Sequence, residues 1–284
     1  MSEADDDRIE QPSEPTGAPR HPREAIADVA VHAPTRGNRR LEALLDAANG
    51  DDRVKAWWHM QQVVATRLDM SDHSWVHVQI VLNIALRLFR LLTRSGVEPA
   101  MVTDHLMRDR DAEVVIAAAC LFHDSGMSIH RTDHESYSLF LAAQALPGLL
   151  ADAYSEPERS VVIAEAQHAI IGHRRRGDPI TVEAGIVRVA DALDLAQGRS
   201  RVPFENRRPN IHSLSAAAID DVQIKAGEDR AVRIEIAMNN SAGIFQVDEL
   251  LATKLRGSGL EEHVEVIARI DAEYEKRLVP VFRI

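Results

Sequence analysis

Histidine and aspartate side chains recur at the ends or along the apolar faces of separate predicted helices. His77 begins one such face, and Asp191 lies on another. His123 and Asp124 end a third. Each of these side chains is expected to face the interior, where an isolated imidazole or carboxylate is costly. A shared metal ion removes that cost, and this ligand set suits iron, manganese, zinc or cobalt, so the pattern predicts a metal site.

The order of these residues along the chain is more specific than any one of them. His77 is followed by Cys-Leu-Phe-His-Asp-Ser-Gly around His123 and Asp124, and then by Arg-Val-Ala-Asp-Ala-Leu-Asp around Asp191. Over residues 72–201 this order resembles the HD-domain superfamily, which is named for its His-Asp pair. The resemblance implies a helical domain in which all four residues bind a first metal ion.

A second ion is implied by the same resemblance. Dinuclear members of the superfamily add two histidines between the His-Asp pair and the last aspartate, and His134 and His168 match them in order. Asp124 would then bridge two divalent ions, manganese or iron, with zinc, cobalt and nickel as further candidates. His173 competes with His168, but on a regular helix the two point about 140° apart. His168 shares a face with apolar residues, so it is the predicted ligand.

One further histidine is left open as a ligand. His73 lies four residues before His77, one helical turn away on the same face. It is either an additional metal ligand or the polar entry residue of the helix.

Basic residues follow the metal-bearing helices. Arg174 comes directly after His173, and Arg199 and Arg201 follow the helix of Asp191. A guanidinium group suits bidentate binding of phosphate oxygens. Arginines late in a helix also complement its negative end, and for the run 174–176 the two interpretations have equal weight. We predict that His173, Arg174, Arg199 and Arg201 bind substrate.

The chemistry that follows is metal-assisted hydrolysis. A bound ion lowers the pKa of a water molecule, and Asp124 is the predicted acceptor of its proton. We therefore expect a metal-dependent phosphohydrolase that cleaves a phosphomonoester or phosphodiester of a small, nucleotide-like molecule. Two alternatives remain: an HD-fold mixed-valent di-iron oxygenase with the same ligands, and a nucleotide-binding regulator. The chain is also similar to uncharacterised archaeal and bacterial HD-type phosphohydrolases, which supply no substrate.

The elements that must position these residues are mainly helical. Apolar residues three and four apart predict successive helices from Leu41 to about Gln197. After about Phe204, alternating residues predict strands around 222–224 and 232–238, a short helix over 247–255 and a strand over 263–270. The fold class is mainly α: an HD-domain helical bundle with a small C-terminal α+β appendage.

Three regions are expected along the chain. Residues 1–40 are acidic and then proline-rich without an apolar period, which predicts a disordered N-terminal tail. Residues 41–205 form the predicted HD-type helical metal-binding domain, and residues 206–284 form the small α+β C-terminal region. A loop at 238–247 in that region is a candidate ligand-binding or homodimer surface.

The amino-acid composition limits which kinds of partner and site the protein can have. The 284 residues include 33 Lys and Arg against 44 Asp and Glu, a net charge of −11, which weighs against a nucleic-acid polymer. Cys120 is the single cysteine, so an internal disulfide and a multi-cysteine zinc module are excluded. No run approaches the roughly 20 apolar residues of a membrane span, and the N-terminus lacks a signal-peptide core. We expect a cytoplasmic protein without a membrane partner, acting on a small phosphorylated substrate.

Overall fold

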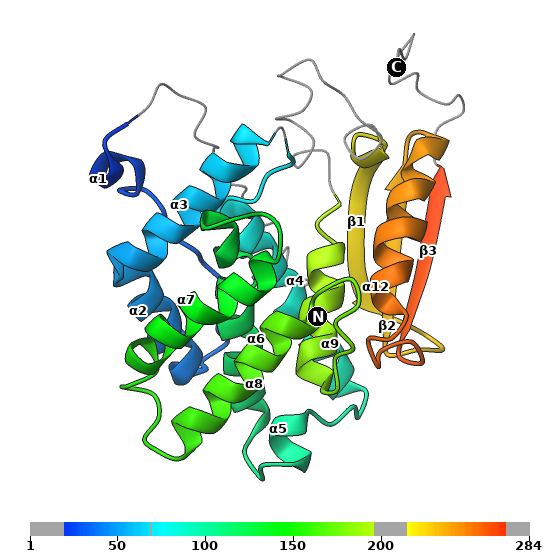
Figure 1. The fold of residues 1–284 in the computed structure, drawn as a ribbon. Coiled ribbons are helices and arrows are strands. Elements are labelled where there is room, and N and C mark those ends of the chain that lie inside the picture. The colour runs from blue at the N-terminus through cyan, green and yellow to red at the C-terminus, as the bar shows by residue number, and fades with distance from the viewer. Residues whose placement is uncertain (1–19, 69, 196–214, 271–284) are drawn as a thin grey trace, which may run out of the picture.

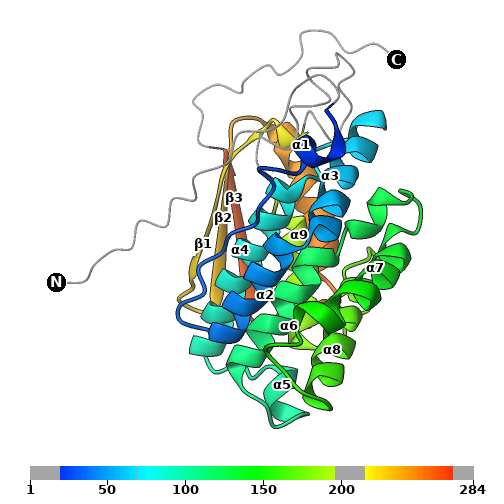
Figure 2. The same cartoon turned by 90° about the vertical axis from the view of Figure 1, so that its left-hand side faces the viewer.

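A helical bundle with a three-stranded sheet against one side forms the fold (Figures 1 and 2). The computed structural model describes residues 20–68, 70–195 and 215–270. The helices of the bundle are α1 (Pro22–Ala25), α2 (Arg39–Gly50), α3 (Asp52–Arg67), α4 (Trp75–Arg94), α5 (Ala100–Thr103), α6 (Asp109–Phe122), η1 (Ser125–Ser128), α7 (His134–Leu149), α8 (Glu158–Gly172) and α9 (Val182–Ala192). This architecture confirms the predicted mainly α fold with a small α+β region at its C-terminal end.

The core is built around α4 and α6. Along α6 every residue from Asp111 to Phe122 is buried, because this segment is an almost unbroken apolar run. Asp111 lies in the first turn of this helix and accepts a hydrogen bond from the Arg108 amide at 3.0 Å. Helix α4 is long and apolar enough to cross a membrane, but 61% of its most apolar window is buried inside the protein. Such burial is typical of a core helix.

Residues 215–270, here called the C-terminal region, contain the sheet. The strands β1 (Ile219–Ala226), β2 (Val232–Met238) and β3 (Val264–Ile270) lie in that order, with β1 antiparallel and β3 parallel to β2. A parallel pair requires a crossover, which is made by η3 (Ser241–Gly243), the π-helical η4 (Gln246–Ala252) and α12 (Thr253–Leu255). The crossover lies in front of the strands in Figure 1.

The C-terminal region shares its core with the bundle. The alternate residues Val232, Ile234 and Ile236 of β2 are buried within the same apolar cluster as α4 and α6. Arg87 of α4 donates from Nε to the carbonyl oxygen of Ile224 in β1 at 2.6 Å. The predicted boundary at residue 205 lies outside the described residues.

The prediction of a disordered N-terminal tail is wrong for residues 20–40. Ile26, Val29 and Val31 are buried against the bundle. Val31 is held at both backbone groups by the amide of Asn49, with both hydrogen bonds 2.9 Å long. Side chains of the bundle bind the backbone of this extended segment, so its buried apolar residues need not recur with the period of a helix or a strand. The sequence therefore showed no periodic pattern that would reveal their burial. Residues 1–19 lie outside the described residues.

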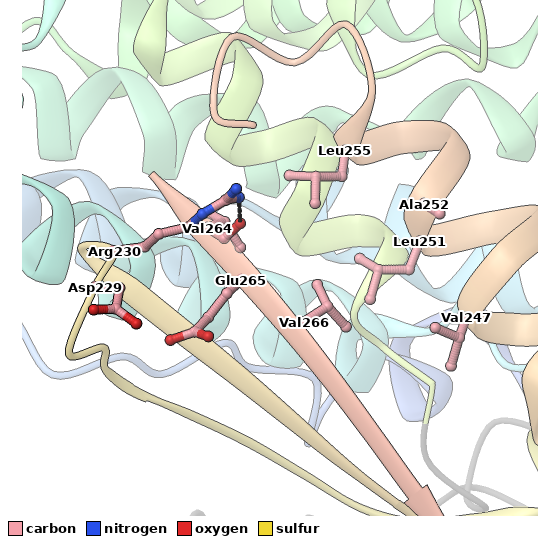
Figure 3. Close-up of a pocket in the computed structure, with 9 residues that line it drawn as sticks. All are labelled: Asp229, Arg230, Val247, Leu251, Ala252, Leu255, Val264, Glu265 and Val266. Carbon is pink, nitrogen blue, oxygen red and sulfur yellow. Dashed lines mark hydrogen bonds between the residues drawn. The ribbon is translucent and has the colours of Figure 1, made fainter. Parts of the chain in front are cut away.

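A cavity of about 470 Å³ lies between the crossover and β3 (Figure 3). Val247, Leu251 and Leu255 line it from the crossover, and Val264 and Val266 line it from the strand. None of the predicted metal-binding residues lines this cavity.

Candidate metal centre

Two groups of side chains that could hold a metal ion meet at the centre of the bundle. The first ligand group is His77, His123 and Asp191, and the second ligand group is Asp124, His134 and His173. Within each group the candidate ligand atoms all lie within 4.8 Å of one another. Five of the six residues are buried, and the side chain of Asp191 is 13% exposed.

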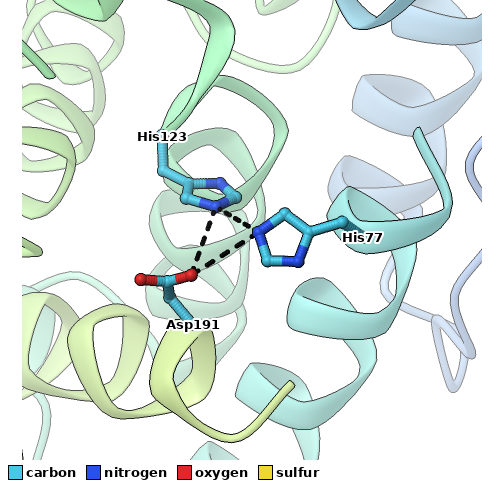
Figure 4. A group of neighbouring side chains, drawn as sticks. All are labelled: His77, His123 and Asp191. Atoms are coloured by element: carbon cyan, nitrogen blue, oxygen red, sulfur yellow. Dashed lines mark hydrogen bonds and ion pairs between the residues drawn. The ribbon is translucent and has the colours of Figure 1, made fainter. Parts of the chain in front are cut away.

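The first ligand group is contributed by three helices (Figure 4). His77 lies in the first turn of α4, where Ser74 caps the helix by accepting a hydrogen bond from the Val76 amide. His123 directly follows α6, and Asp191 lies in the last turn of α9. Nε2 of His77 is 3.2 Å from Nε2 of His123 and 3.5 Å from Oδ1 of Asp191.

The second ligand group depends on a close approach between η1 and α7. A Cβ atom on Gly126 would lie 2.0 Å from the carbonyl oxygen of His134, so a larger residue would displace α7. Ser138 joins the two segments: its hydroxyl accepts from the Gly126 amide at 2.9 Å and donates to the His123 carbonyl at 2.8 Å. The glycine after the His-Asp pair therefore lets His134 reach Asp124.

Asp124 belongs to the second ligand group and also faces the first. Its Oδ2 is 3.5 Å from Nε2 of His77 and 3.5 Å from Nε2 of His123. Its Oδ1 is 3.0 Å from Nε2 of His134 and 3.7 Å from Nε2 of His173. One carboxylate oxygen therefore faces each group, an arrangement that fits a carboxylate shared by two ions.

The hydrogen bonds of His77, His123 and His173 are those expected of metal ligands. Nδ1 of His77 donates to Asp194 at 2.6 Å, and Nδ1 of His123 and of His173 donates to the carbonyls of Cys120 and Ile170 at 2.8 and 2.6 Å. Their Nε2 atoms then carry lone pairs. Two lone pairs that face each other across 3.2 Å repel unless a cation lies near both. Fixing Nδ1 in this way is typical of metal-ligating histidine.

Protonation states also favour a metal. Burial lowers the pKa of His123, and burial with the charge of Lys254 lowers the pKa of His173 to about 3. Burial opposes ionisation of Asp124, but the neighbouring histidines outweigh it and hold the pKa well below its usual range. For Asp191 burial is likewise outweighed, chiefly by Lys254. Neutral imidazoles and ionised carboxylates are the forms that bind a cation.

The structure brings His173 to the second ligand group, in the position expected for His168. The buried face of α8 carries Val162, Ala166 and Ala169, and His173 continues it one turn later. His168 is half-buried on another face, where its Nε2 accepts a hydrogen bond from the Ile180 amide at 3.1 Å. Alanines lie on both sides of this helix, so the apolar pattern selected the wrong face. His173 was predicted to contact the substrate, but it is buried among the candidate metal ligands.

The predicted phosphate-binding arginines are only partly described. The guanidinium of Arg174 is half-buried and donates to the hydroxyl of Ser136 in α7. Arg175 is exposed and pairs with Glu249 at 3.2 Å. Arg199 and Arg201 lie outside the described residues. His73 is buried beside His77, with ring centroids 5.5 Å apart, but it belongs to neither ligand group.

Two residues at the centre were not predicted in these roles. Asp194 accepts the Nδ1 proton of His77 at 2.6 Å. Lys254 of α12 donates to Oδ2 of Asp191. It lies 63 residues after Asp191, in a segment with no local signal that connects it to the metal site.

Comparison with known proteins agrees with this geometry. The family model for the HD domain matches residues 71–196. The chain is 36% identical over 222 residues, 78% of its length and 86% of the relative's, to the uncharacterized protein MJ1020 of Methanocaldococcus jannaschii. No solved structure matches the chain. The HD family consists largely of metal-dependent phosphohydrolases. The chain belongs to the HD-domain family, in an uncharacterised branch that it shares with this archaeal relative.

Proposed function

We propose that the chain is a metal-dependent phosphohydrolase that cleaves a phosphomonoester or phosphodiester of a small, nucleotide-like molecule. The observation that carries the proposal is the position of Asp124, whose two oxygens each face a different ligand group. Two divalent ions, manganese or iron, would be held by the six residues of the two groups. Paired ions that share a carboxylate are suited to displacement at phosphorus.

The side chains have distinct tasks in this proposal. When bound, the metal ions acidify a water molecule and polarise a phosphoryl oxygen. His77, His123 and His173 hold their Nε2 atoms toward the centre through their Nδ1 bonds. Asp124 has a low pKa and is therefore a weak base. It orients the attacking water and accepts its proton only because that water is already acidified.

Cationic groups near the centre favour an anionic substrate. Lys254 contacts Asp191, Arg131 lies with Nη1 2.8 Å from Nδ1 of His134, and Arg174 reaches α7. The net charge of −11 would repel a long polyanion. A small phosphorylated molecule can bind beside these cationic groups without contacting the acidic surface elsewhere on the protein.

A substrate screen tests the proposal. Mononucleotides, cyclic nucleotides and short oligonucleotides would be incubated with the chain loaded with manganese, iron, zinc, cobalt or nickel, and phosphate release and new phosphomonoester ends measured. We expect hydrolysis of a small substrate with at least one metal, and its loss together with metal loading in His123→Ala and Asp124→Ala. Folded, fully loaded variants with wild-type activity would contradict the assignment.

The same screen separates two other functions. A mixed-valent di-iron oxygenase uses the same ligand set, but it consumes dioxygen. Turnover with manganese under anaerobic conditions would therefore exclude it, whereas oxygen uptake with iron would replace our proposal. A nucleotide-binding regulator would bind a nucleotide in the metal-loaded state without converting it.

A further inference from the structure

Lys254 connects the C-terminal region to the candidate metal centre. Among the side-chain hydrogen bonds and ion pairs of the described residues, its pair with Asp191 is the one that joins this region to a candidate ligand. Its ammonium group donates to Oδ2 of Asp191, while Oδ1 of the same carboxylate faces His77 and His123. The side chain is 18% exposed, so the charge sits in a largely desolvated position. The C-terminal region thus places a positive charge at the edge of the centre.

The backbone at Lys254 is held in place from α9. Arg188, which is 3% exposed, donates from Nε to the Lys254 carbonyl at 2.8 Å and from Nη2 to the Arg175 carbonyl at 2.9 Å. One guanidinium therefore joins α12 to the segment that follows His173. Such a desolvated, multiply bonded arginine fixes geometry on both sides.

A second contact keeps the C-terminal region against α9. A Cβ atom on Gly185 would lie 2.1 Å from the carbonyl oxygen of Ser258, four residues after Lys254. The backbones therefore approach as closely as a glycine permits. This docking places Lys254 within reach of Asp191.

The charges indicate what Lys254 contacts in the loaded centre. Asp124 and Asp191 supply two negative charges, and two divalent ions would supply four positive ones. An ammonium group beside that excess of positive charge is unfavourable unless an anion lies there too. Lysine is a compact point charge on a flexible stem and a frequent phosphate ligand.

We propose that Lys254 is a substrate-binding residue of the metal centre: it pairs with Asp191 in the metal-free protein and with a phosphoryl oxygen of the substrate in the loaded protein. The C-terminal region is then part of the site, not an independent appendage. The inference rests on the proposed function for the identity of the anion.

The test compares three variants of the full chain. Lys254→Met removes the charge at similar length, and Lys254→Arg keeps it. The control Lys225→Met removes a cation from β1, where Lys225 is 44% exposed and pairs with Glu235 at 2.8 Å. Each variant is loaded with manganese and freed of excess metal, and its metal content and melting temperature are measured. Inorganic phosphate is then titrated in by calorimetry.

We expect Lys254→Met to keep its metal content and to bind phosphate about tenfold more weakly or worse, the loss typical of one charge-assisted hydrogen bond. Lys254→Arg should recover part of the affinity, and Lys225→Met should match the wild type. Unchanged phosphate affinity in Lys254→Met would overturn the inference. Loss of metal from that variant would also overturn it, because Lys254 would then support the ligands and not the anion.

The outcomes separate this inference from the proposed function. A chain that hydrolyses a phosphate ester, with KM and phosphate affinity unchanged in Lys254→Met, refutes the role of Lys254 alone. A chain that loses phosphate binding in Lys254→Met but hydrolyses no ester in the screen refutes the proposed function and leaves the anion contact standing. A loaded wild-type chain that binds no phosphate refutes the contact directly.

Discussion

Asp194 is the residue that fixes how His77 faces the centre. Its carboxylate receives the Nδ1 proton of His77 at 2.6 Å, deep in the bundle. Asp194→Ala should weaken manganese binding about 10- to 100-fold, the usual cost of losing a partner of a metal ligand. Calorimetric titration would measure the affinity, with Asp46→Ala on the exposed side of α2 as the control. Equal affinities in both variants would show that His77 needs no such support.

His173 and His168 give a direct test of the second ligand group. His173→Ala removes a buried imidazole whose Nε2 is 3.7 Å from Asp124, so the chain should retain fewer metal ions per molecule after desalting. His168→Ala removes a half-buried ring bonded to a backbone amide, so metal content should stay at the wild-type value. Elemental analysis of both proteins decides between them, and the reverse result would restore His168 as the ligand.

His134 predicts how acid removes the metal. Burial opposes its protonation, but the hydrogen bond and charge of Asp124 outweigh it and raise its pKa above the usual value of about 6.5. Burial lowers the pKa of His123, so that ring stays neutral at lower pH. Metal competes with protons for neutral imidazole, so affinity at the second ligand group should fall first as pH drops through the raised pKa.

Metal content after desalting at stepped pH values measures this order. We expect the ion of the second ligand group to leave at higher pH than the ion of the first. His134→Gln should abolish the earlier step while preserving the later one. Loss of both ions in one step, unchanged in that variant, would contradict the prediction.

The contact between α9 and the C-terminal region can be tested at Gly185. In Gly185→Ala the new methyl group would meet the Ser258 carbonyl, so the elements must separate, at a cost of about 1–3 kcal/mol in the free energy of unfolding. Gly50→Ala at the end of α2 is the matched control, because nothing lies within 4 Å of its Cβ position. Chemical denaturation of both proteins measures the difference. Equal stabilities would mean that the docking is looser than the backbone approach implies.

Prediction of the elements from sequence succeeded where each helix carried its own periodicity. The helices expected from Leu41 to about Gln197 include α3 to α9, and the strand expected over 232–238 is β2. Local periodicity did not identify which face of an alanine-rich helix is buried, so His168 was preferred to His173. It also could not identify Lys254, whose position depends on how α12 docks against α9.

At the scale of the whole molecule, bundle and C-terminal region should unfold together. They share one buried apolar cluster and are joined by the Arg188 and Arg87 hydrogen bonds. Calorimetry should therefore show a single thermal transition, and chelation should move it to lower temperature. A ligand at 100 times its Kd stabilises the folded state by about 2.7 kcal/mol. Two separate transitions would show that the bundle and the C-terminal region unfold independently. A melting temperature that the chelator does not change would show that bound metal does not stabilise the fold.

The crossover between β2 and β3 has a consequence for synthesis of the chain. All six candidate ligands precede residue 192, whereas Lys254 follows β2 and lies on the connection that only β3 completes. On the ribosome, the histidines and aspartates therefore emerge before the segment that carries Lys254. Because the bundle and the C-terminal region share one buried core, the ligands are expected to be held in place only after the later segment that carries Lys254 has been made.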